Sequence, residues 1–120
     1  MNREELRAFC LSRPGAWEDQ PFGDDTVVFK VAERMFALMP VSGPLTISLK
    51  CDPVWAQILR DTYPAVTPAY HFNKRHWNGV SLEDDSLPPD EVLAMIDHSY
   101  ELVVKALPRR SREKLPPPQK

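Results

Sequence analysis

One stretch of the sequence, residues 70–78 (YHFNKRHWN), gathers most of the side chains that could carry out recognition chemistry. It holds three aromatic rings, a lysine, an arginine, two histidines and two asparagines. Aromatic rings can stack on nucleic-acid bases, Lys74 and Arg75 can contact phosphates, and asparagine can read base edges. This composition favours a nucleic-acid-binding segment. The same rings could instead seal a loop against the core, with His and Asn satisfying buried backbone groups.

A second basic feature lies at the end of the chain. Residues 108–120 carry five Lys/Arg against one Asp/Glu, a net charge of +4, whereas residues 1–107 carry 10 against 16, a net charge of −6. Arg109 and Arg110, with Arg112 and Lys114, could supply a salt-sensitive grip on a phosphate backbone. The acidic body differs from the usual nucleic-acid-binding domain, whose pI often exceeds about 9. Any binding is therefore expected to come from a local patch and to be weak.

Other kinds of chemistry find little support in the sequence. His71 and His76 are five residues apart, which matches no familiar metal-binding spacing, and His98 belongs to a predicted helix. There is no G-x-S-x-G motif, no activated cysteine motif and no phosphate-binding glycine loop. The sequence thus predicts a protein without a metal, a cofactor or an enzymatic activity.

Composition indicates one ordinary globular domain. The chain has 120 residues, 42% hydrophobic and 27% charged, and no apolar run approaches the roughly 20 residues that a membrane span needs. The N-terminus carries Glu4 and Glu5 where a signal peptide would be apolar, and Cys10 and Cys51 are interpreted as reduced thiols. We expect a cytoplasmic protein that does not associate with membranes, and of the possible oligomeric states a monomer is favoured.

The first half of the chain is predicted to form a helix followed by a β-meander. Asn2 and Glu5 have the spacing of a capping box, and the helix that they start should end near Pro14-Gly15. Three β-rich runs follow at residues 27–31, 35–41 and 45–50, with short links typical of antiparallel strands. The first link, Ala32-Glu33-Arg34, lacks the glycine that a tight hairpin prefers.

The second half is predicted to alternate helices and a strand. Asp52-Pro53 should start a helix, with Trp55, Ile58 and Leu59 among the residues on its buried face. A strand is expected at 76–82 and a long helix from Pro88 to about Leu107. The resulting order, α-β-β-β-α-β-α, predicts an α+β domain over 1–107: a two-layer α/β sandwich whose helices pack on one face of an antiparallel sheet. The tail, 108–120, is expected to be disordered.

Several segments, in matching order over residues 3 to 115, resemble the MmcQ/YjbR proteins. The resemblance covers Trp17 to Phe22-Gly23, FKV at 29–31, MFAL at 35–38, LKCDP at 49–53, YHFNKRHWN at 70–78 and DHSYELV at 97–103. The hairpin at Ala32-Glu33-Arg34 departs from the glycine-containing turn expected there.

This resemblance implies a bacterial protein with a fold similar to the frataxin-type (CyaY-like) sandwich. It also implies DNA binding through a double-wing arrangement of the sheet, and no catalytic residues. An alternative is a small-ligand or protein-binding module with a pocket around Tyr70, His76 and Trp77; a metal-handling domain is a third and weaker hypothesis. The predicted nucleic-acid-binding residues are Lys50, Tyr70, His71, Asn73, Lys74, Arg75, His76, Trp77, Asn78, Arg109 and Arg110.

Overall fold

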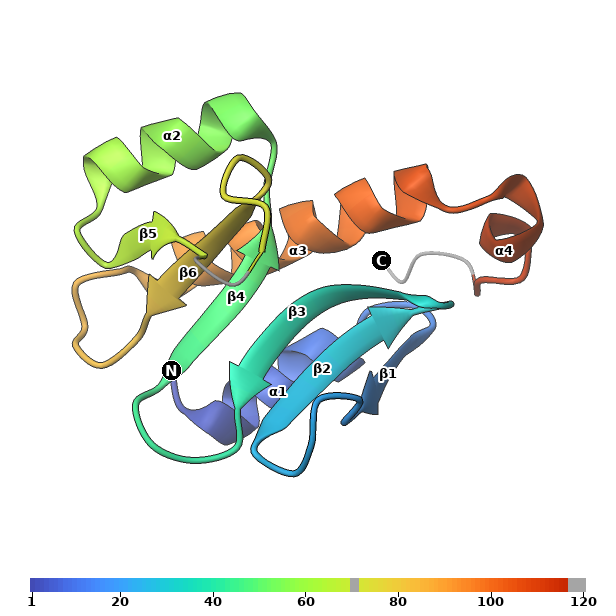
Figure 1. Ribbon diagram of the computed structural model, residues 1–120, viewed down its shortest axis with the longest axis horizontal. Helices are drawn as coiled ribbons and strands as arrows, with labels where there is room; N and C mark the ends of the chain where they lie inside the picture. The colour runs from blue at the N-terminus through green and yellow to red at the C-terminus, as the bar shows by residue number, and fades with distance from the viewer. Residues whose placement is uncertain (70–71, 117–120) are drawn as a thin grey trace.

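The computed structural model describes residues 1–69 and 72–116 and contains one antiparallel sheet (Figure 1). Six strands lie in the order β1-β2-β3-β4-β6-β5, so β1 and β5 form the two edges. Helix α3 packs against β2, β3 and β4, α1 packs against β1, and α2 packs against β5. In Figure 1, α1 and α3 lie behind the sheet. The α+β class and the antiparallel sheet predicted from the sequence are confirmed.

Helix α1 spans Arg3–Leu11 and begins as predicted. The Asn2 side chain accepts a hydrogen bond from the Glu5 backbone N–H, and the Glu5 carboxylate accepts one from the Asn2 N–H. This reciprocal pair satisfies two backbone donors that a helix N-terminus otherwise leaves free. Leu6 and Cys10, four residues apart, are completely buried and fix the face that α1 turns toward the core.

The central strands β2 (Thr26–Val31), β3 (Arg34–Pro40) and β4 (Thr46–Lys50) confirm the predicted meander. The link between β2 and β3 shortens to Ala32 and Glu33, because Val31 pairs with Arg34. Ala32 adopts a φ of +52°. That left-handed conformation costs an alanine roughly 1–2 kcal/mol and is the reason why glycine is preferred in such a turn.

Two edge strands were not predicted, β1 (Ala16–Asp19) and β5 (Val66–Pro68). The predicted element order was therefore wrong, and the observed order is α-β-β-β-β-α-β-β-α-α. Strand β1 carries only two apolar residues and ends in two acids, and β5 has three residues and ends in proline. Edge strands pair on one side only, so they need neither long apolar runs nor a full set of donors.

Helix α2 spans Pro53–Thr62 and begins at the predicted cap, where the Asp52 carboxylate accepts from the Val54 and Trp55 N–H groups. The predicted apolar face was partly wrong, because Ile58 is 53% exposed. Leu59 is buried as predicted, and Ala56, which the prediction did not include, is buried beside it. The helix thus turns a narrower apolar stripe to the core than its hydrophobic residues suggested.

Strand β6 (Trp77–Ser81) and helix α3 (Pro89–Ala106) agree with the prediction. Helix α3 crosses the middle of the sheet and supplies much of the core. Its Ser99 is fully buried, where its hydroxyl donates to the Phe36 carbonyl and accepts from the Lys50 N–H. The largest fully buried side chains include Phe29, Phe36, Leu6, Met39, Ile47, Leu49, Ile96, Val28 and Val31.

The two cysteines are free and buried, in agreement with the thiol interpretation. Burial raises the pKa of the Cys10 thiol to about 12 and that of Cys51 to about 11. Both sulfurs are therefore protonated at neutral pH and behave as small apolar groups.

The C-terminal segment differs from the expected disorder over its described part. Arg109–Glu113 form a short helix, α4, and Leu115 packs against the core. A Cβ on Gly15, whose φ is +74°, would lie 2.7 Å from the Leu115 side chain. Glycine at that position therefore lets the C-terminal segment lie against the residues that follow α1, while residues 117–120 lie outside the described part of the chain.

Candidate functional site

The predicted recognition segment forms the loop between β5 and β6. We call residues 72–77 the β5–β6 loop; Tyr70 and His71 lie outside the described residues. The loop folds on itself through Asn73, whose side-chain oxygen accepts from the Arg75 N–H at 3.0 Å and whose carbonyl accepts from the His76 N–H at 3.1 Å. This turn leaves the Lys74 and Arg75 side chains exposed at the tip.

Arg60 of α2 holds the loop against the helix layer. Its Nε donates to the Asn78 side-chain oxygen at 2.7 Å, and its Nη2 donates to the carbonyls of Trp77, at 3.3 Å, and of Lys74. One guanidinium thus binds three acceptors within residues 74–78 and fixes this short segment to α2. Sequence analysis did not single out Arg60, since a lone arginine in a helix carries no motif.

Asn78, predicted to read base edges, is only 2% exposed. It lies in β6 opposite Leu49, facing the core, and its side chain is bound to Arg60. A buried amide cannot reach a base, so in this structure Asn78 supports the loop and does not form part of a contact surface. Asn73 is similarly engaged by the turn, although its side chain remains exposed.

Two aromatic rings form a stacked pair at the base of the loop. The rings of Phe72 and Trp77 lie 4.9 Å apart between centroids, with 28° between their planes, and both residues are half-buried. Trp77 pairs with Lys50 across the β4–β6 ladder, which places the Lys50 side chain beside the indole on the same face of the sheet. Lys50 is thereby placed beside the aromatic pair, while Lys74 and Arg75 lie at the exposed tip of the same loop.

The two described histidines, His76 and His98, do not converge on a metal site, and His71 lies outside the described residues. His76 is half-buried, and its carbonyl accepts from the Cys51 N–H at 2.7 Å. His98 lies against Trp55, and its Nε2 accepts from the Asp52 N–H at 3.1 Å. Burial lowers the pKa of His98, which favours the neutral ring. Over residues 1–69 and 72–116, no group of three or more His, Cys, Asp or Glu is arranged to hold a metal ion.

The predicted basic residues of the tail lie at the other end of the molecule. Arg109 and Arg110 belong to α4, which Figure 1 shows beyond the C-terminal end of α3, far from the β5–β6 loop. Arg109 is paired with Glu113 at 2.8 Å. The structure therefore does not combine the two predicted basic features into one surface.

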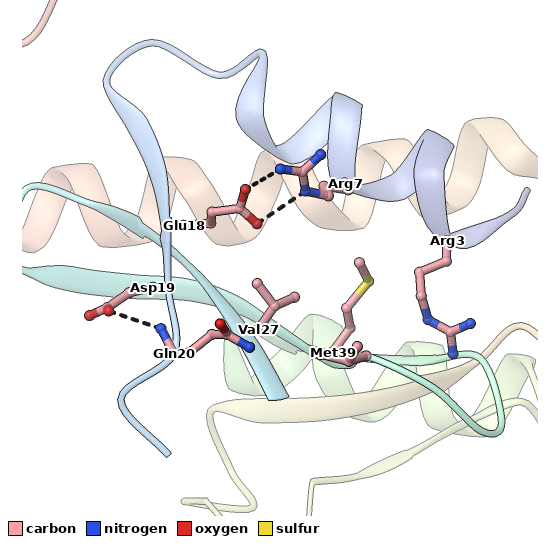
Figure 2. Close-up of a pocket in the computed structure, with 8 residues that line it drawn as sticks. Arg3, Arg7, Glu18, Asp19, Gln20, Val27 and Met39 are labelled. Atoms are coloured by element: carbon pink, nitrogen blue, oxygen red, sulfur yellow. Dashed lines mark hydrogen bonds and ion pairs between the residues drawn. The ribbon is translucent and has the colours of Figure 1, made fainter. Parts of the chain in front are cut away.

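Within residues 1–69 and 72–116, two of the clefts lie away from this loop and are not lined by His76 or Trp77. One, of about 600 Å³, lies between α3 and the segments that follow α1 and α4. The other, of about 570 Å³, lies between α1 and strands β1, β2 and β3 and is drawn in Figure 2. The space beside Lys50 and Asn78 is only about 10 Å³. Because Tyr70 lies outside the described residues, the alternative pocket around Tyr70, His76 and Trp77 stays a prediction.

The cleft in Figure 2 was missed by sequence analysis. Arg7 of α1 pairs with Glu18 of β1 across its mouth, and this pairing raises the pKa of Arg7 and lowers that of Glu18. Val27 and Met39 point into it from the sheet. The available signal was Arg3 and Arg7, four residues apart on one helix face, but the unpredicted strand β1 supplies the opposite wall.

Comparison with known proteins finds similarity along nearly the whole chain. A family model described as YjbR matches residues 11–102. The chain is 34% identical to "Uncharacterized protein YjbR" of Escherichia coli K12 over 116 residues, covering 96% of this chain and 98% of that protein. It is 33% identical over 115 residues to "Uncharacterized protein YbdF" of E. coli O157:H7, covering 95% and 93%.

Solved structures give the same result. The crystal structure of Deinococcus radiodurans protein DR2400, with a domain called DUF419, has a TM-score of 0.88 and 36% identity, covering 98% of this chain and 91% of that one. A crystal structure of a Pseudomonas syringae protein has a TM-score of 0.72 and 28% identity, covering 85% and 98%. The alignment with the Deinococcus radiodurans structure therefore covers nearly the whole chain.

Proposed function

Because the chain belongs to the YjbR family, whose members matched here come from bacteria, we propose that it is a non-enzymatic nucleic-acid-binding module that acts as a monomer in the cytoplasm. The proposed contact surface is the β5–β6 loop together with Lys50. We further propose that the layers correspond to the frataxin-type sandwich, which a superposition on a frataxin structure would test.

The observation that carries this proposal is the stacked pair Phe72–Trp77 next to exposed Lys74 and Arg75. Aromatic side chains next to cations suit unpaired bases, which can stack on a ring while their phosphates meet the charges. The loop is also held in shape by Arg60 and by the Asn73 turn, so binding would not require ordering a flexible segment. These features favour single-stranded over duplex nucleic acid.

Net charge sets an upper limit on the proposed affinity. The body of the chain carries −6, so long-range repulsion opposes a polyanion except at the loop. We therefore expect dissociation constants in the micromolar range or weaker at physiological salt, similar to non-specific binding at about 10⁻⁴–10⁻⁶ M.

The test is fluorescence anisotropy of labelled single-stranded and duplex oligonucleotides, measured at several salt concentrations. A Lys74→Ala/Arg75→Ala variant should weaken single-strand binding at least about tenfold and reduce the salt slope by about 1.4, about 0.7 for each of two phosphate contacts on a single strand. An Arg109→Ala/Arg110→Ala variant is the matched control, because it removes the same charge from α4.

Equal losses in the two variants would reduce the effect to general electrostatics. A loss confined to the α4 variant would assign binding to the tail and contradict the loop proposal. If the unaltered protein showed no binding at low salt, the nucleic-acid function would be rejected.

A further inference from the structure

The cleft between α1 and strands β1, β2 and β3 has an unpaired cation at one end and an apolar floor. Arg3 lies at that end, and Val27 and Met39 point into the middle of the cleft (Figure 2). The sheet register explains the floor, because Val27 pairs with Met39 and both side chains lie on the face that packs against the helices. Val41, which is 45% exposed, extends the apolar surface to the rim.

The Arg3 guanidinium is fixed in place and keeps its full charge. Its Nε donates to the Pro40 carbonyl and its Nη2 to the Gly43 carbonyl, both at 3.0 Å. Within residues 1–69 and 72–116, no carboxylate forms an ion pair with Arg3, and its Nη1 is neither buried nor hydrogen-bonded. An oriented guanidinium with free N–H groups suits a carboxylate ligand.

At the opposite end, the described residues offer the cleft no unpaired charge. Asp19 pairs with Val28, so its side chain lies on the other face of the sheet from the cleft floor. There Lys30 neutralises it, at 2.9 Å. The Gln20 side-chain amide, which lines this end, donates to the Asp24 carbonyl at 3.3 Å. A ligand that fits the cleft therefore has one charged end and needs no second one.

An ion pair crosses above the apolar floor. Arg7 and Glu18 pair with each other, so their charges offset (Figure 2). Because both side chains are partly exposed, water can replace either partner, and the pair can move apart at little cost. An alkyl chain lying over Val27 and Met39 thus meets no unpaired charge and gains from the burial of its own surface.

From this arrangement we propose that the cleft binds a linear fatty carboxylate of medium length, with its carboxylate at Arg3 and its alkyl chain lying over Val27 and Met39 toward β1. The length follows from the sheet. Neighbouring strands lie about 4.8 Å apart, so β1 and β3 are separated by about 10 Å. Extended chains advance about 3.5 Å for every three bonds, so an eight-carbon chain spans roughly 8 Å. The volume of about 570 Å³ falls within the range of small-ligand pockets, about 300–1,000 Å³.

The test is a titration of the unaltered protein, labelled with ¹³C at its methionine methyl groups, with octanoate. The Met39 methyl signal should shift, because Met39 lines the cleft, while Met35 and Met95 should stay in place as internal controls. Octanamide has the same alkyl chain without the charge and should bind at least about tenfold more weakly. From butyrate through hexanoate to octanoate, affinity should rise at least about twofold for each methylene, since full burial of a methylene gives about fourfold.

Variants assign the two parts of the cleft. Arg3→Gln should lower the affinity for octanoate to that for octanamide, and Arg3→Lys should retain part of it, whereas the matched control Arg34→Gln should leave binding unchanged. Val41→Ser should weaken the dependence on chain length, and Val54→Ser, which changes an exposed valine on α2, should not. Because Arg3 also anchors a turn, its variants are interpreted only with an unchanged methionine spectrum before titration; octanamide tests the same contact without any variant.

Equal affinities for octanoate and octanamide would overturn the carboxylate assignment. Equal affinities for butyrate and octanoate would leave only an adventitious anion at Arg3 and would overturn the alkyl-chain assignment. No shift at Met39 up to tens of millimolar octanoate would reject the site. None of these outcomes depends on nucleic-acid binding by the β5–β6 loop.

Discussion

The β5–β6 loop and the α1–β1 cleft are both held by an arginine that reaches from a helix to the sheet, but the two arginines meet different surroundings. Arg60 binds buried Asn78 and two backbone carbonyls. Arg7 binds Glu18, and both side chains are partly exposed, at 54% and 32%. Water can replace Glu18 as a partner for Arg7, whereas it cannot readily reach Asn78.

This difference indicates which of the two regions is rigid. Removal of a buried partner leaves unsatisfied polar groups, and removal of an exposed partner returns both groups to solvent. The loop should therefore depend strongly on Arg60, while the mouth of the cleft should open at little cost. A preformed loop suits a surface contact.

The largest expected effect is that of Arg60→Ala. The change leaves the buried Asn78 side-chain oxygen without its Arg60 donor and removes one donor from the carbonyls of Lys74 and Trp77, so the free energy of unfolding should fall by about 3 kcal/mol. Urea unfolding followed by circular dichroism measures this. In an Arg60→Met/Asn78→Leu double variant, which removes both partners, the loss should be smaller than in Arg60→Ala. A loss of less than about 1 kcal/mol in Arg60→Ala would contradict the comparison.

Next in size is Ala32→Gly, in the turn next to β1. Glycine adopts a φ of +52° without the strain that alanine bears, so unfolding should require about 1 kcal/mol more. Thermal and urea unfolding should both report the gain. Glu33→Gly is the control, since Ala32 is the residue with positive φ at this turn. A destabilised Ala32→Gly protein would mean that the turn is not strained.

The two regions should also differ in pH dependence. The pKa of His98, beside the α2 cap, lies below its ordinary 6.5, because burial outweighs the carboxylates of Asp52 and Glu101, and Lys105 lowers it further. At a pH between the pKa values of His98 in the folded and in the unfolded chain, the unfolded chain binds more protons. The contribution of His98 to the free energy of unfolding is therefore complete above pH 6.5 and is lost as the pH drops below it.

The pKa values of Glu18 and Asp19 are also lowered, so their contribution to stability is likewise lost as the pH falls. This loss occurs at lower pH, below the ordinary pKa values of 4.5 for Glu18 and 3.8 for Asp19. Urea unfolding from pH 8 to pH 3 should show both steps, and His98→Gln should remove only the upper one. An unchanged upper step in His98→Gln would assign it to another group.

The smallest effect is expected for Arg7→Ala. Because both partners are exposed, the urea midpoint should remain within error of the unaltered protein. A large loss of stability would show that the Arg7–Glu18 pair is as important as the Arg60 contacts.

The parts of the fold that could be predicted were those encoded within a few residues. The Asn2–Glu5 capping box, the Asp52-Pro53 helix start and the alternating strand at Trp77–Ser81 all lie where expected. Strands β1 and β5 were missed because an edge strand is defined by its partner. The exposure of Ile58 was missed because periodicity does not say how much of a helix its neighbours cover.

The candidate site was predicted only as a segment. Its aromatic and basic residues were found from composition, and Asn78 was misread because its buried position depends on Arg60, 18 positions earlier. Arg3 could not be connected with Pro40 or Gly43, nor Arg7 with Glu18, before the strands between them were placed.

By itself, the sequence determined the helix starts, the central meander, the free thiols and the aromatic and basic character of the β5–β6 loop. These depend on backbone hydrogen bonding, side-chain period and residue chemistry, all of which act over a few positions. Only the tertiary structure decided that Asn78 is buried, that α4 lies far from the loop and that α1 and β1 enclose a cleft. Those outcomes depend on contacts between distant segments, which local patterns do not specify.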